Sequence, residues 1–261
     1  MTASAGNGVQ SIERAFSILR AVSTEQAGIS EIARRVSLPI STTARILATL
    51  EELHAVVRVD STTYAIGASV AELAASIDPT ASLLTRARAH LHELVALVGE
   101  TAGLAIADGT RNVRYIDQVE ADHEVQLRDW TGTSLPMHVV SSGQVLLAFR
   151  HQVEIEQYLK NELPAFTIKT IIDPSKLRSR LRAVVNDGVV WTAEEFHEGI
   201  TSVAAPVFGA DGRVAAALHC HGPSFRFPRA NARREVELAV AAAAHRLSFP
   251  TVIEQSKKLG A

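Results

Sequence analysis

The pattern of hydrophobic and polar positions divides the chain near residue 78. Before that point, apolar residues recur at helical spacing in three stretches. They predict helices over residues 10–22, from the N-cap Ser30 to residue 36, and over residues 41–54. The residues expected to face inward are Ile12, Ala15, Phe16, Leu19 and Val22, then Ile32, Ala33 and Val36, then Ile46, Leu47, Leu50 and Leu53. Two β-branched runs, residues 56–59 and 63–66, predict a small hairpin, and residues 70–74 begin a linking helix that ends at Asp78.

The residues after this point alternate between helix and strand patterns. An amphipathic stretch over residues 83–98 predicts a long helix ending at Gly99, and strands are expected on both sides of the Asp108-Gly109 turn. A short alternating stretch at Val125 and Leu127 is expected to lead into a loop over residues 132–136. Further elements are predicted as helices over residues 142–149, 153–160, 174–187 (between Asp173 and Gly188) and 229–247, and strands over residues 189–193, 202–208 and 213–221. This order predicts an α+β domain with antiparallel strands over residues 79–261, after an N-terminal domain over residues 1–78.

Composition narrows the class of protein. The 261 residues are 47% hydrophobic and 21% charged, which is typical of a folded protein and too apolar for a disordered one. No apolar run approaches the roughly 20 residues that cross a bilayer, and residues 1–10 lack the pattern of a secretion signal. The single cysteine, Cys220, excludes an internal disulfide and fits a reducing compartment. These features predict a cytoplasmic globular protein.

The helix predicted over residues 41–54 has a polar face. At about 100° per residue, Ser41, Thr42, Arg45 and Thr49 share one arc, opposite the inward leucines. Three helices followed by a hairpin describe a winged helix-turn-helix. Short hydroxyl side chains and an arginine on the third helix are suited to reading DNA bases. The alternative is an ordinary solvated helix face. Charge favours that alternative, because residues 1–78 hold six Arg and no Lys against eight acidic residues, whereas DNA-binding domains are usually basic.

Short segments carry a resemblance that covers nearly all of residues 9–248. They read VQSIERA at 9–15, GISEIARR at 28–35, LPISTTARILATL at 38–50, YAIG at 64–67, GETA at 99–102, PMH at 136–138, SGQVLLA at 142–148, EE at 194–195, GI at 199–200, AAPV at 204–207 and GP at 222–223. In this order and spacing they closely resemble the isocitrate lyase regulator (IclR) family of bacterial transcription factors.

The resemblance implies a winged helix-turn-helix joined by a helix to a GAF-like effector domain. It also implies a dimer or dimer of dimers on double-stranded promoter DNA, with no cofactor and no membrane. The residues then expected to contact DNA are Arg34, Arg35, Ser41, Thr42, Arg45 and Thr49. Three departures stand out: Ile40 replaces a usual basic residue, Gln144 replaces a usual lysine, and His54-Ala55-Val56 replaces Gly-Tyr-Val. The change at Ile40 weakens the expected hold on phosphate, not the fold.

Catalysis is the other class of function to be weighed. Serine and histidine residues such as Ser141 and His138 suggest a hydrolase, but the sequence lacks a Gly-x-Ser-x-Gly elbow, a glycine-rich phosphate loop and a metalloprotease helix. Glu194 and Glu195 are adjacent on a predicted strand, so we expect them to point to opposite faces. Cys220 is more typical of a buried small residue than of a nucleophile. We therefore expect a regulator and not an enzyme.

The resemblance places a small-molecule site before the helix predicted at residues 142–149. It nominates Leu127, Leu135, Ser141, Ser142, Thr192, Ser202, His219 and His221. The serines lie at a helix start that can bind a carboxylate. The histidines are two apart on a predicted strand and leave the same face, so we expect them to bind a small organic anion, such as a carboxylate or aromatic acid. Two alternatives stay open: packed or solvent-facing histidines, or a divalent metal with His138 or His197 as third ligand.

Overall fold

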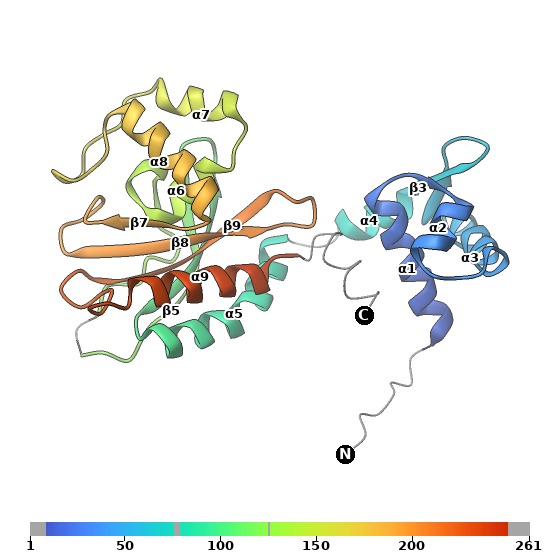
Figure 1. The fold of residues 1–261 in the computed structure, drawn as a ribbon, viewed down its shortest axis with the longest axis horizontal. Helices are drawn as coiled ribbons and strands as arrows, with labels where there is room; N and C mark the ends of the chain where they lie inside the picture. The colour runs from blue at the N-terminus through green and yellow to red at the C-terminus, as the bar shows by residue number, and fades with distance from the viewer. Residues whose placement is uncertain (1–8, 76–78, 125, 250–261) are drawn as a thin grey trace, which may run out of the picture. The chain divides into compact units, whose positions relative to one another are not determined.

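The computed structural model describes residues 9–75, 79–124 and 126–249. They form two compact units, one ending at Ala81 and the other beginning at Ser82 (Figure 1). The boundary lies within the helix α5 (Pro79–Val98). No helix in the described ranges is long and apolar enough to cross a membrane.

The N-terminal unit is a helix-turn-helix followed by a hairpin. In chain order, its described elements are α1 (Gln10–Thr24), the short strand β1 (Ala27–Gly28), α2 (Ile29–Arg35), α3 (Ile40–Glu52), β2 (Val56–Arg58), β3 (Thr63–Ile66) and α4 (Ala68–Ala75). The strands form an antiparallel sheet in the order β1-β3-β2. The predicted winged helix-turn-helix is confirmed, with β1 as an addition that the sequence does not predict.

One face of each of the first three helices builds the core of this unit. Ile18, Ile32 and Leu47 are fully buried there. The predicted inward face of α1 is wrong in part, because Ile12 and Phe16 are 56% and 57% exposed. Phe16 and Ile18 are two positions apart on a helix and point to nearly opposite sides, so burying Ile18 exposes Phe16.

Two predicted helix ends also differ from the structure. Gly28, not Ser30, is the N-cap of α2, and it makes no side-chain capping bond. The helix α3 ends at Glu52, so Leu53 follows it and is 62% exposed. On the buried face of α3 lies Thr43, whose hydroxyl donates to the Pro39 carbonyl oxygen at 3.1 Å.

The C-terminal unit is a six-stranded antiparallel sheet with helices on both faces. After α5 its described elements are β4 (Thr101–Asp108), β5 (Asn112–Val119), β6 (Ser134–Pro136), the 3-10 helix η1 (Met137–Val139), α6 (Ser141–Ala148), α7 (Gln152–Leu159), α8 (Pro174–Asp187), β7 (Val190–Ala193), β8 (Ile200–Phe208), β9 (Val214–Pro223) and α9 (Arg233–Leu247). The strand order is β6-β5-β4-β9-β8-β7. Figure 1 shows α5 and α9 along one face, and α6 to α8 over the other. The predicted α+β fold is confirmed.

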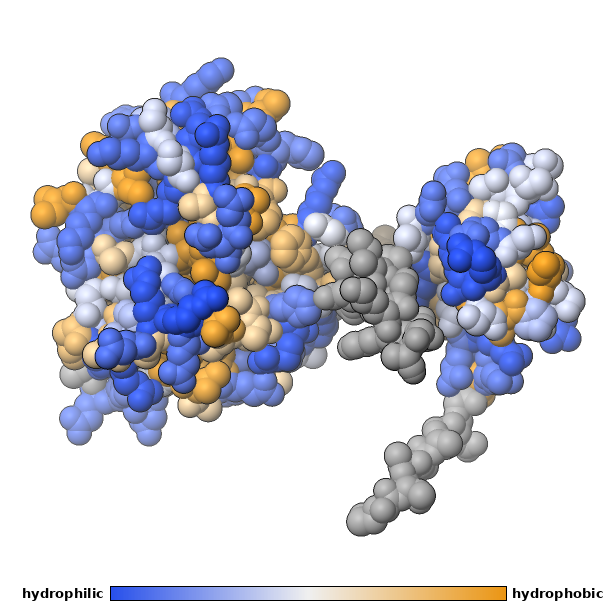
Figure 2. Space-filling view, viewed as in Figure 1, coloured by the Kyte–Doolittle hydropathy of each residue, from blue (hydrophilic) through white to orange (hydrophobic). Residues whose placement is uncertain are grey.

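Each face of this sheet has its own core. On the α5 and α9 face, Leu218 and Cys220 of β9 are fully buried, and burial raises the pKa of the Cys220 thiol. Ala217 belongs to the core on the α6 face. Because side chains alternate along a strand, His219 and His221 share the face of Ala217. Outside these cores, hydrophilic residues predominate on the face of the unit drawn in Figure 2.

The helix ends in this unit follow local sequence rules. Asp173 caps α8, as predicted, by accepting bonds from the backbone N–H groups of Ser175 at 2.7 Å and Lys176 at 3.2 Å. Gly188 ends α8 in the left-handed region, with φ of 70°.

The structure describes only part of the alternating stretch at Val125 and Leu127. Val125 lies outside the described residues, and Leu127 lies in a segment without regular structure. The predicted loop over residues 132–136 contains β6, which pairs with β5. The prediction that Glu194 and Glu195 lie on a strand is wrong, because β7 ends at Ala193 and Glu194 has a φ of 59°.

Candidate functional site

The outer face of α3 presents the four side chains predicted to contact DNA. Ser41, Arg45 and Thr49 are exposed, and Thr42 is half-buried. Among the described residues, the Arg45 guanidinium has no ion pair or hydrogen bond. Leu47 anchors the opposite side of the helix in the core. The helix therefore offers an available arginine and short hydroxyl side chains on a fixed support, which is what readout in the major groove needs.

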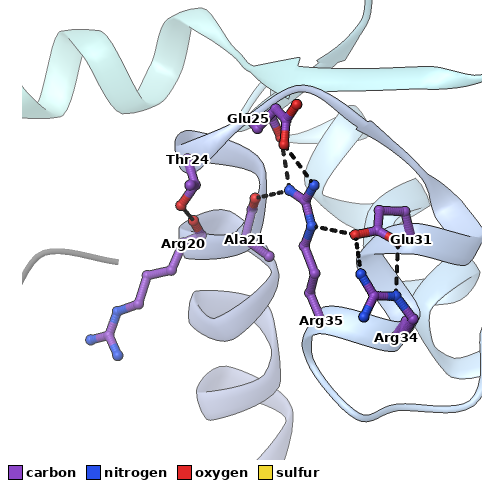
Figure 3. A network of polar contacts seen from close by, with 7 residues as sticks. All are labelled: Arg20, Ala21, Thr24, Glu25, Glu31, Arg34 and Arg35. Atoms are coloured by element: carbon purple, nitrogen blue, oxygen red, sulfur yellow. Dashed lines mark hydrogen bonds and ion pairs between the residues drawn. The ribbon is translucent and has the colours of Figure 1, made fainter. Parts of the chain in front are cut away.

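The two arginines beside the turn are bound within the chain, as Figure 3 shows. Arg34 donates from Nε and Nη2 to the two carboxylate oxygens of Glu31, at 2.9 and 2.6 Å. Arg35 donates to the carboxylates of Glu31 and Glu25, at 2.8 and 3.0 Å, and to the main-chain oxygens of Ala21 and Glu25. The arginine side chains lower the pKa of Glu31 to about 2. The Arg34 side chain is 74% exposed, whereas that of Arg35 is 24% exposed and joins the end of α1 to α2.

A cavity lies on the α6 face of the sheet in the C-terminal unit. Its volume is about 30 Å³, room for one or two water molecules. The wall is formed by Tyr115, Trp130, Leu135, Val140, Thr192, Glu195, Phe196, Ile200, Ser202 and His221. The structure thus brings together four of the predicted effector residues: Leu135, Thr192, Ser202 and His221.

The two predicted serines lie at the start of α6, beside the cavity. The Ser141 hydroxyl is hydrogen-bonded to that of Ser202, and the Ser142 hydroxyl donates to the Tyr115 hydroxyl at 3.3 Å. The N-cap of α6 is Val140, which lines the cavity and provides no side-chain cap. The N–H groups of the first turn therefore lie next to the cavity wall, the arrangement by which helix starts bind anions.

His219 and His221 stack on one another, with ring centroids 5.4 Å apart. His221 lines the cavity. His219 does not line it, and its ring packs edge-on against that of Tyr115. Among the described residues, Nε2 of His221 and both ring nitrogens of His219 have no hydrogen-bond partner. Burial lowers the pKa of His219 well below its usual range and that of His221 to about 4. Both rings are therefore neutral near pH 7 in the absence of a ligand, and a neutral ring can still donate one hydrogen bond.

The predicted third metal ligands lie elsewhere. Nε2 of His138 donates to the Pro164 carbonyl oxygen at 3.1 Å, and its Nδ1 accepts from the Tyr158 hydroxyl at 2.9 Å. Nδ1 of His197 donates to the Glu198 carbonyl oxygen at 2.7 Å. In the described part of the chain, no three His, Cys, Asp or Glu side chains are grouped so that they could hold a metal ion.

Glu195 is a wall residue that the sequence alone does not assign to this site. It is 6% exposed, and its two carboxylate oxygens accept from Gln144 at 3.0 Å and from Arg180 at 3.2 Å. Burial raises the pKa of this carboxyl, and Arg180 and Gln144 oppose that shift. Glu194 pairs instead with Lys169. The two adjacent carboxylates thus have different partners, because of the left-handed turn at Glu194 and not because of strand alternation.

The aromatic wall residues differ in how well the sequence marks them. Tyr115 is two positions after Val113 on a predicted strand, so strand alternation predicts its inward side chain. Trp130 and Phe196, whose ring centroids are 5.5 Å apart, lie outside helices and strands, where no periodicity marks the inward positions. Leu127, a predicted wall residue, is half-buried but does not line the cavity.

Residues 11–60 match the family model of the IclR helix-turn-helix domain, and residues 78–249 match that of the bacterial transcriptional regulator IclR C-terminal domain. The chain belongs to the IclR family. The HTH-type transcriptional regulator KdgR of Dickeya chrysanthemi is 31% identical over 240 residues, which cover 91% of this chain and 78% of KdgR. The helix-turn-helix is therefore a DNA-binding domain, and the expectation of a transcriptional regulator and not an enzyme is confirmed.

Solved structures of IclR-family proteins share the fold. An IclR transcriptional regulator from Silicibacter sp. TM1040 has a TM-score of 0.79 and 25% identity, covering 91% of this chain and 94% of that one. An IclR homologue from Microbacterium hydrocarbonoxydans, complexed with 4-hydroxybenzoate, has a TM-score of 0.60 and 24% identity, covering 91% of this chain and 97% of that one.

Proposed function

We propose that this IclR-family chain binds an inverted repeat in promoter DNA and that a small organic acid in the cavity changes its affinity for that DNA. The DNA-binding domain is residues 1–78, and the effector domain is residues 79–261. The observation that carries the DNA-binding part is Arg45 on α3, which is exposed and whose guanidinium has no partner in the described part of the chain. Arg45 contacts a base edge, Ser41, Thr42 and Thr49 support it, and Arg34 reaches a phosphate.

A second copy of the chain completes the DNA-binding surface, because one winged domain reads too short a site. Ile12 and Phe16 of α1 are more than half exposed, and Leu73 of α4 is 71% exposed. Large apolar side chains on the surface of so small a unit favour contact with another protein. We infer a homodimer, or a dimer of dimers, that joins its DNA-binding domains through α1 and α4.

The proposed effector is a carboxylate or an aromatic acid. The first-turn N–H groups of α6 offer a carboxylate site, His221 Nε2 offers a further donor, and Tyr115, Trp130 and Phe196 offer aromatic surface. A cavity of about 30 Å³ is smaller than any organic acid, so binding requires the wall to open. Trp130 and Phe196 lie outside helices and strands, and we infer that they move.

Footprinting tests the proposal with the full chain and the promoter region beside its own gene. We expect two protected half-sites about one helical turn apart, or a multiple of that spacing, and a change in protection when an effector acid is added. A thermal-shift screen of organic acids finds that effector, since a ligand at a hundredfold excess over its dissociation constant stabilises the folded state by about 2.7 kcal/mol. Protection of a single half-site, or none, would overturn the DNA-binding part.

A further inference from the structure

Glu195 places a fixed carboxylate in the cavity wall. Gln144 of α6 and Arg180 of α8 hold its two oxygens, and each of these donors is itself fixed by a main-chain oxygen. Nε2 of Gln144 also donates to the His138 carbonyl oxygen at 2.8 Å, and Nη1 of Arg180 to the Trp191 carbonyl oxygen at 2.9 Å. Because both holding residues are anchored, the carboxylate of Glu195 cannot easily turn away from a bound molecule.

The position of Glu195 relative to α6 sets the pattern of charge in the cavity. Glu195 is held through Gln144, which lies on α6 three residues after Ser141. Arg180 offsets the charge of Glu195 from the solvent side, since its side chain is 33% exposed. The other polar wall residues, such as Thr192, Ser202 and His221, are uncharged near pH 7. An anionic group is thus stabilised at the helix start and not beside Glu195.

We propose that Glu195 determines which acids the cavity accepts: it accepts a hydrogen bond from a hydroxyl or amino group of the effector and excludes a second carboxylate. This inference rests on the proposed effector site. A molecule with a carboxylate at one end and a hydrogen-bond donor at the other can bind both the start of α6 and the Glu195 carboxylate. A dicarboxylate brings a second negative charge against Glu195 in a buried site, where like charges repel strongly. The aromatic rings of the wall favour a flat ring as the spacer.

Calorimetry with four ring compounds tests the inference on the full chain. The probes are benzoate, 4-hydroxybenzoate, 4-aminobenzoate and terephthalate, which differ only in the group opposite the carboxylate. We expect the wild type to bind 4-hydroxybenzoate or 4-aminobenzoate at least about tenfold more tightly than terephthalate. In the Glu195→Gln variant, the ratio of the terephthalate dissociation constant to that of the donor compounds falls by about tenfold or more, because the new amide can donate to a carboxylate. Glu194→Gln, which changes the neighbouring carboxylate outside the cavity wall, keeps the wild-type ratio.

The outcomes separate this inference from the effector site itself. Terephthalate binding to the wild type as tightly as the two donor compounds overturns the role of Glu195, and this comparison needs no variant to fold. An unchanged preference in folded Glu195→Gln does the same, while binding of the probes still supports the effector site. If none of the four compounds binds the wild type at millimolar concentration, the proposed aromatic-acid effector is overturned, and the inference with it.

Discussion

The imidazole of His219 lies against Gly103 on the neighbouring strand. The two residues are paired directly in the register of β4 and β9. A Cβ atom at position 103 would lie 2.6 Å from Cε1 of His219 and 2.9 Å from the Asp117 carbonyl oxygen. The glycine therefore makes room for a ring that an ordinary strand residue would exclude. Space, not hydrogen bonding, accommodates His219 in the core, since neither of its nitrogens has a partner among the described residues.

Substituting alanine for Gly103 is expected to destabilise the C-terminal unit. Overpacking of a tight core costs about 1–3 kcal/mol, and the new methyl group meets both a ring and a main-chain oxygen. Urea unfolding measures the loss. In the double variant Gly103→Ala, His219→Ala, the collision with the ring is gone and the collision with the Asp117 oxygen remains. We therefore expect the double variant to lose less stability than the sum of the losses in the two single variants. Additive losses would show that the ring and the glycine are not coupled.

Acid is expected to destabilise the same unit through its buried histidines. The folded chain holds the pKa of His221 at about 4 and that of His219 well below 6.5. The unfolded chain therefore binds more protons over this interval, and the free energy of unfolding falls as the pH is lowered from about 6.5 towards 4. His221→Gln removes one titrating group, so its stability should fall less steeply than that of the wild type. Urea unfolding at several pH values tests this, and equal slopes would contradict it.

The sequence predicts best what local chemistry determines. The cap at Asp173 and the left-handed glycine Gly188 could be placed because each acts on residues beside it in the chain. The buried face of α1 is predicted less well. Its apolar residues run around more than one side of the helix, and only packing against the other helices decides that Ile18 is buried and Phe16 exposed.

The candidate site depends even more on contacts between residues that are distant in the chain. Ser141 meets Ser202 across 61 residues, and Glu195 meets Gln144 across 51, so their pairing depends on the register of the whole sheet. Family resemblance nominates Ser141 and Ser202 without that register. Glu195 is part of a matched segment, yet its place in the wall follows from the left-handed turn at Glu194, which residue types alone do not predict for a glutamate.

Removing the side chain of Arg45 is expected to weaken specific DNA binding. If its guanidinium makes a bidentate base contact, Arg45→Ala costs about 1–3 kcal/mol. Footprint titration over the promoter region beside the chain's own gene measures this loss. Arg213→Ala is the matched control, because Arg213 is an exposed arginine of the C-terminal unit. Equal protection by wild type and Arg45→Ala would remove Arg45 from the interface.

Neutralising Glu31 is expected to strengthen non-specific DNA binding. Its carboxylate accepts from Nε and Nη2 of Arg34, whose side chain is otherwise exposed, and it offsets the charge that Arg34 brings to a phosphate. Glu31→Gln removes that offset. The slope of log affinity against log salt should then steepen by up to about one. Fluorescence anisotropy with a random duplex at several salt concentrations measures it. Glu25→Gln, which touches Arg35 and not Arg34, should leave the slope unchanged. A slope unchanged in Glu31→Gln would show that Arg34 does not reach DNA.

A charge placed on the exposed side of α1 is expected to weaken self-association. Phe16 is 57% exposed, so Phe16→Glu should leave the core of its unit folded while it introduces two like charges at a contact between copies. Light scattering over a dilution series should show the wild type as a dimer or larger at micromolar concentration, and the variant dissociating at about tenfold higher concentration or more. Val153→Glu, a comparable change at an exposed position of α7, is the control. A monomeric wild type without DNA would contradict the proposed homodimer, whereas a dimer unaffected by Phe16→Glu would place the contact elsewhere than α1.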